Sequence, residues 1–157
     1  MKSNFERMMK LAEDVFAVKN DPEQLDVNED VIEQLIAIHS ATVSEHDEGE
    51  GPVAWVLVIP TITVLMNRFL KKEITEKQLF LLTQNEKHFE TVYLCSALVL
   101  EEHRRKGITK QLAINAIEQI KVNHRIESLF VWSFSKEGEL AAEKIAEQTK
   151  FELFKRN

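Results

Sequence analysis

One segment of the chain reads Ala97-Leu-Val-Leu-Glu-Glu-His-Arg-Arg-Lys-Gly-Ile-Thr-Lys-Gln-Leu112. An apolar, strand-like run leads directly into a basic turn with a single glycine, and a helical pattern begins immediately after the turn. The first turn of a helix leaves backbone N–H groups without partners, and the aligned peptide dipoles add positive charge there. The order of strand, turn and helix therefore predicts a binding site for a phosphate-bearing ligand.

Four cationic side chains surround the glycine of this turn, namely Arg104, Arg105, Lys106 and Lys110. Gly107 can adopt a left-handed conformation, and it allows a ligand to approach the main chain closely. From the motif alone a second interpretation stays open, in which the basic residues are a solvated turn and the glycine only permits a bend.

The spacing Arg104-x-x-Gly107-x-Thr109, between a β run and a helix, resembles the Q/R-x-x-G-x-G/A signature of the GNAT superfamily of N-acetyltransferases. In that superfamily a second core strand, a helix and a strand opened by Gly-Phe follow the signature. Residues 91–155 resemble this order, and Lys150-Phe151-Glu152 resembles the Gly-Phe-Glu with its glycine replaced.

The resemblance implies an α/β (α+β) fold of the acyl-CoA N-acyltransferase type, with a mixed, mostly antiparallel central sheet flanked by helices. Residues 1–157 would form a single domain, with residues 91–155 as its cofactor-binding half and residues 1–90 as a divergent N-terminal half. The divergence arises because the superfamily usually has a β-hairpin where this sequence predicts one strand followed by two helices.

The same resemblance implies that acetyl-CoA is the cosubstrate. Backbone groups of Leu98, Val99 and Leu100 would pair with the pantetheine arm and polarise the thioester carbonyl, and main-chain N–H groups of the turn would hold the pyrophosphate. The implied cofactor-binding residues are Leu98, Val99, Leu100, Arg104, Arg105, Lys106, Gly107, Ile108, Thr109 and Lys110.

No catalytic residue is assigned. The superfamily tyrosine that often protonates the leaving thiolate corresponds to Ala146, and a frequent asparagine corresponds to Glu139. Tyr93, the only tyrosine, and Cys95 share a face of the signature strand if its pairing is regular. They are weak candidates for the proton donor, because ordinary core positions account for both residues more simply.

Other titratable residues near this strand can be explained either by a catalytic role or by an ordinary structural role. Glu86, His88 and Glu90 precede it and suit either a proton relay from an ammonium group or a solvated turn. His103 is expected to feel the positive charge of the adjacent turn. The five histidines have no metal-ligand spacing, so no metal site is predicted.

Composition limits the possible partners. The chain has 157 residues, 44% of them hydrophobic, which is typical of one globular domain. Its net charge of −6 disfavours nucleic acid or an anionic membrane as a partner. Cys95 is the only cysteine, so no intrachain disulfide is possible and a cytoplasmic location is expected. The N-terminus does not read as a signal peptide, and the apolar run Val53–Pro60 is too short to span a bilayer.

Periodicity and capping signals predict helices over residues 4–18, from Asp26 or Asn28 to about Ala41, and over 63–72, 75–84, 110–122 and 138–149. Strands are predicted over 53–59, 91–100, 129–134 and 151–155, with Pro60 stopping the first. The acidic stretch Ser44–Gly51 is predicted to be a mobile, solvated loop, and the C-terminal lysine and arginine are expected to serve solubility. The predicted apolar stripe of the first helix consists of Phe5, Met8, Met9, Ala12, Val15 and Phe16.

These features together favour an acyltransferase that moves an acetyl group from acetyl-CoA to an amine of a small molecule or peptide. The alternative is a non-catalytic acyl-CoA-binding or interaction module that keeps the cofactor turn on a degenerate acetyltransferase fold. Acceptor identity and oligomeric state are not indicated by the sequence.

Overall fold

The computed structural model describes residues 2–19 and 23–157, and of residues 16–19 only the backbone. The described helices are α1 (Asn4–Lys19), α2 (Glu29–Ile38), α3 (Thr63–Leu70), α4 (Glu76–Thr83), α5 (Ile108–Asn123), α6 (Lys136–Thr149) and the short 3-10 helix η1 (Glu101–His103). The described strands are β1 (Val43–Asp47), β2 (Pro52–Thr61), β3 (Thr91–Val99), β4 (Ser128–Val131) and β5 (Glu152–Lys155).

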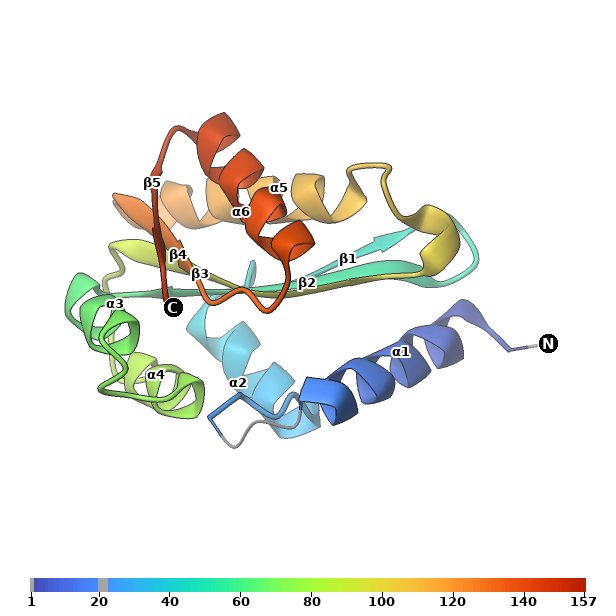
Figure 1. Ribbon diagram of the computed structural model, residues 1–157, viewed down its shortest axis with the longest axis horizontal. Coiled ribbons are helices and arrows are strands. Elements are labelled where there is room, and N and C mark those ends of the chain that lie inside the picture. Colours follow the sequence, from blue (N-terminus) through green and yellow to red (C-terminus); the bar gives the residue numbers. More distant parts are fainter. Residues whose placement is uncertain (1, 20–22) are drawn as a thin grey trace.

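The strands form one mixed, five-stranded sheet in the order β1-β2-β3-β4-β5. The β1–β2 and β2–β3 ladders are antiparallel, whereas β3–β4 and β4–β5 are parallel, as strands joined by a crossover helix must be. Helices α5 and α6 cover one face of the sheet, and α1 to α4 lie on the other (Figure 1). The protein is therefore a mixed α/β protein with an open sheet between helices.

The predicted loop over Ser44–Gly51 is wrong in its first half. Val43–Asp47 is the edge strand β1, and it pairs with β2 through a hairpin whose Asp47 side chain accepts hydrogen bonds from the amides of Gly49 and Gly51. Charged side chains are common on edge strands, because one edge of such a strand faces water. The acidic composition of this stretch thus reflects an edge strand and a turn.

Pro60 does not stop β2, whose ladder with β3 continues to Thr61. The Val58 N–H donates to the Thr42 carbonyl on the β1 side, so by alternation the nitrogen of Pro60 also faces that side. The β1 ladder has already ended there, at Val43 opposite Leu57. A proline in this position removes no ladder hydrogen bond.

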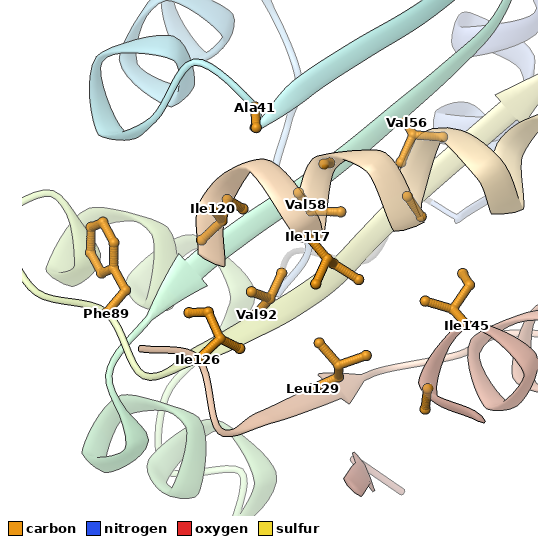
Figure 2. Close-up of a cluster of buried hydrophobic side chains, with 13 residues drawn as sticks. Ala41, Val56, Val58, Phe89, Val92, Ile117, Ile120, Ile126, Leu129 and Ile145 are labelled. Carbon is orange, nitrogen blue, oxygen red and sulfur yellow. The ribbon is translucent and has the colours of Figure 1, made fainter. Parts of the chain in front are cut away.

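A cluster of buried apolar side chains joins α5 to the sheet (Figure 2). Ile117 and Ile120 of α5 are fully buried, and they lie over Val58, Val92 and Leu129 of the three central strands. Burying one such side chain stabilises the fold by roughly 1.5–3 kcal/mol. This packing fixes α5 against the sheet and so fixes the turn from which α5 starts.

The predicted helix boundaries are largely confirmed, although some predicted apolar faces are not. Thr75 forms the expected capping box with Gln78 at the start of α4. In α1, Met8 is buried but Phe5 and Met9 are exposed, and the side chain of Phe16 lies outside the described residues. Leu140, an apolar position of the helical pattern predicted over 138–149, is also exposed.

Two imidazole rings lie at the C-terminal end of α5. The His39 Nδ1 accepts a hydrogen bond from the Ala41 amide at 3.0 Å, and the His124 Nδ1 accepts one from the Phe89 amide at 3.3 Å. Burial lowers the pKa of His124 from 6.5, and the neighbouring His39 and His88 lower it further. The folded state therefore favours neutral His124.

Because this pKa is depressed by folding, the stabilising contribution is complete above about pH 6.5 and is lost as the pH falls below that value. Replacing His124 with asparagine, which does not titrate in this range, is expected to reduce the loss of stability on acidification. Urea unfolding of both proteins between about pH 8 and about pH 5 measures this, and identical pH slopes would contradict the assignment.

Candidate cofactor and acceptor cleft

A cleft opens in the sheet where β3 and β4 part. The two strands are paired only from Thr91 to Leu94 of β3, and β3 then continues to Val99 while β4 ends at Val131. Beyond this point lies a cavity of about 320 Å³, lined by β2, β3, the segment after β4 and the first turns of α5 and α6. Ligands of open α/β sheets bind at such places, outside the carboxyl ends of parallel strands.

The N-terminus of α5 lies at this cleft. Gly107 caps the helix in the left-handed conformation, with φ of 75°, and no side chain caps the end. The first intrahelical bond there runs from the Gln111 N–H to the Gly107 carbonyl, so the amides of residues 108–110 have no partner within the helix. Thr109 and Lys110 line the cleft, which places the helix end at the wall of the cavity.

The turn before α5 is open and cationic. A Cβ atom added to Gly107 would meet no other atom within 4 Å. Arg104, Arg105 and Lys106 are exposed, and neither they nor Lys110 make an ion pair with any residue that the structure describes. The structure thus brings the seven predicted turn residues, 104–110, together at one corner.

The three predicted pantetheine-binding residues are not equivalent. The Leu100 N–H donates to the Val53 carbonyl of β2 at 2.9 Å and is therefore occupied. Backbone groups alternate along a strand, so those of Leu98 also point to β2, whereas those of Ala97 and Val99 point to the open edge beside the cleft. Of the three predicted residues, only Val99 therefore turns its backbone groups toward the open edge, together with Ala97, which the sequence pattern did not single out.

A β-bulge interrupts β3 at Cys95. Leu57 of β2 pairs with Ser96, but the next residue, Val58, pairs with Leu94, so Cys95 is the extra residue. A bulge bends its strand and increases the local twist. It lies where β3 leaves β4. The pairing is therefore not regular at Cys95, although Cys95 still packs against the same apolar cluster as Tyr93.

Tyr93 is a core residue with a structural hydrogen bond. Its hydroxyl donates to Glu76 Oε2 at 2.5 Å, and its ring stacks on Phe130. Burial, followed by the charge of Glu76, raises its pKa well above the usual value of 10. Tyr93 does not line the cleft, whereas Cys95 does. The core interpretation of Tyr93 is thus the right one.

The other residues considered for proton transfer, and the two at superfamily positions, do not line the cleft. The Glu90 carboxylate accepts a hydrogen bond from the Thr63 amide at the start of α3. Glu139 pairs with Lys155 at 2.9 Å, and that hydrogen bond lowers the pKa of Glu139 from its usual value. Ala146 is buried in the core beside α5. His103 Nδ1 lies 3.4 Å from Glu48 Oε2, so it faces an acidic hairpin as well as the basic turn.

Arg156 is a buried residue that sequence reasoning missed. Its side chain is 2% exposed, and its guanidinium carbon lies 4.4 Å from the ring centre of Phe69 and 4.3 Å from that of Trp132. The Arg156 N–H donates to the Val131 carbonyl, so the chain after β5 continues beside the end of β4. The expectation that the C-terminal arginine serves solubility is therefore wrong.

Comparison of the chain with protein-family models, with curated proteins and with solved structures gives no match. Over residues 2–19 and 23–157, none of the helices combines the length and apolar character needed to cross a bilayer. In the same part of the chain no three His, Cys, Asp or Glu side chains are grouped as they would be around a metal ion.

Proposed function

We propose that the protein is an acyl-CoA-dependent N-acyltransferase that moves an acetyl group from acetyl-CoA to an amine. The observation that carries this proposal is the open, cationic N-terminus of α5 at the wall of a cleft between two parting parallel strands. The N-terminus of α5 can bind a diphosphate through its free amides. The open edge of β3 beside it can form backbone hydrogen bonds with an extended arm that carries amides.

In this proposal the amides of residues 108–110 bind the pyrophosphate, with Lys110 and the exposed residues 104–106 balancing its charge. The pantetheine amides pair with the backbone of Ala97 and Val99 along the open edge of β3. The acceptor nitrogen then forms a bond to the thioester carbonyl carbon, the C–S bond breaks, and the proton lost by the amine ends on the CoA thiol. A backbone N–H near the bulge would stabilise the intermediate oxyanion.

A non-catalytic acyl-CoA-binding module is the second candidate. It is favoured by the apolar Ala146 and by the hydrogen bond that holds Tyr93 away from the cleft. Both candidates predict CoA binding, and they differ only in turnover.

Calorimetric titration with acetyl-CoA, followed by a free-thiol assay across a panel of amines, separates the two functions. We expect saturable binding and amine-dependent thiol release. Binding without release for any amine would support the module. Absence of binding would contradict both candidates.

A further inference from the structure

The guanidinium of Arg156 has unmet hydrogen-bonding capacity. Among the residues that the structure describes, its buried Nε and Nη1 atoms have no hydrogen-bond partner, and its ion-pair partner is Glu23, whose Oε2 lies 3.7 Å from Nη2. A buried donor without a partner costs roughly 1–3 kcal/mol, and more when it is charged. Native structures rarely keep such groups, and those they keep call for an explanation.

The other groups around Arg156 do not satisfy it. Glu76 is the buried carboxylate of this region, but its Oε2 accepts from the Tyr93 hydroxyl and its Oε1 from the Leu25 amide. Phe69 and Trp132 contact the guanidinium with their rings, which stabilise the charge but accept no in-plane N–H bond. A planar carboxylate is the group that matches the edge of a guanidinium.

Arg156 is placed beside the cleft. It follows β5 as Trp132 follows β4, and β3, β4 and β5 are parallel, so both residues lie at the carboxyl-terminal edge of the sheet. Trp132 contacts the guanidinium and also lines the cleft. Arg156 does not itself line the cavity, and the Trp132 ring connects it to the cavity wall.

We propose that Arg156 binds the carboxylate of a small amine ligand in place of Glu23, so that the acceptor is an amino acid or another amine with a carboxylate. Glu23 is half-exposed and belongs to the segment before α2, and its Oε2 lies 3.7 Å from Nη2, which is longer than a hydrogen bond. A ligand carboxylate would displace it and complete the bonds that Nη1 lacks. The acceptor assignment rests on the proposed acyltransferase function, but the carboxylate site does not.

The test uses three amino acids and their decarboxylated counterparts, so that each pair differs in the carboxylate alone: alanine and ethylamine, leucine and 3-methylbutylamine, phenylalanine and 2-phenylethylamine. Binding to the whole, CoA-free protein is followed through the NMR signal of the Arg156 Nε–H, which is assigned by its loss in Arg156→Lys. At least one amino acid is expected to shift this signal and to bind about tenfold more tightly than its counterpart.

Glu23→Gln removes the internal competitor from an exposed position and is expected to raise the affinity for that amino acid about threefold. Glu33→Gln, an exposed change on α2, is the control and should leave the affinity unchanged. The proposal falls if no amino acid binds better than its counterpart, if the Arg156 signal does not respond, or if Glu23→Gln has no effect. If the protein binds the amino acid through Arg156 but does not bind acetyl-CoA, the carboxylate site is supported and the acyltransferase proposal is contradicted.

Discussion

Replacing Gly107 with glutamate is expected to weaken acetyl-CoA binding by about tenfold or more. The substitution has two effects at the same place. A non-glycine residue at φ of 75° costs roughly 1–2 kcal/mol, because Cβ crowds the backbone in the left-handed region. In addition, the new carboxylate would lie at the helix end proposed to bind the pyrophosphate, where it competes with and repels the ligand.

The chain offers a closely matched control. Gly49 also has a positive φ, of 114°, and a Cβ atom there would likewise meet nothing within 4 Å. It belongs to the β1–β2 hairpin, whose Glu48 contacts His103 just before the turn. Gly49→Glu therefore adds the same charge and also strains a positive-φ position in the same region of the molecule, but not at the helix end.

Titration of both variants with acetyl-CoA, with thermal unfolding as a check on folding, distinguishes a local site from general charge repulsion. Loss of binding in Gly107→Glu alone is the expected result. Equal affinities in the two variants would remove the turn from the binding site, because general charge and strain would then account for any change.

The helices were predictable because their signals are local. The pattern around Gly107, the capping box at Thr75 and the asparagine cap at Asn28 each depend on residues within one or two turns of each other. The cationic turn was therefore placed correctly at the start of α5 from sequence alone.

The details that shape the cleft depend on contacts far apart in the sequence. The bulge at Cys95, and with it the orientation of Leu98 and Leu100, follows from the register between β2 and β3. Arg156 is buried because Phe69 and Trp132, distant along the chain, meet beside it. A lone arginine near a C-terminus carries no local signal of burial, and the polar sequence of β1 resembles that of a loop.

Replacing Ile117 with alanine is expected to lower the free energy of unfolding by about 3 kcal/mol, within the range of roughly 2–5 kcal/mol for such core truncations. Ile117 has no exposed surface and lies in the cluster between α5 and the sheet (Figure 2). Its loss would remove apolar contacts and leave a cavity, since neighbours such as Ile120 and Leu129 belong to elements that are themselves held in place. For a domain with about 5–15 kcal/mol of total stability, this is a large fraction.

Val122→Ala is the matched control, because Val122 is also β-branched and on α5 but is 83% exposed. It should leave stability unchanged or slightly raised, since alanine has the higher helix propensity. Ile117 lies ten residues from Gly107, about 15 Å along the helix axis, so the folded fraction of Ile117→Ala should still bind acetyl-CoA. Urea unfolding and calorimetry together test both statements. Equal stabilities of the two variants would contradict the packing described for Ile117. If folded Ile117→Ala failed to bind acetyl-CoA, the packing of α5 at Ile117 would affect the turn at Gly107 despite the distance between them.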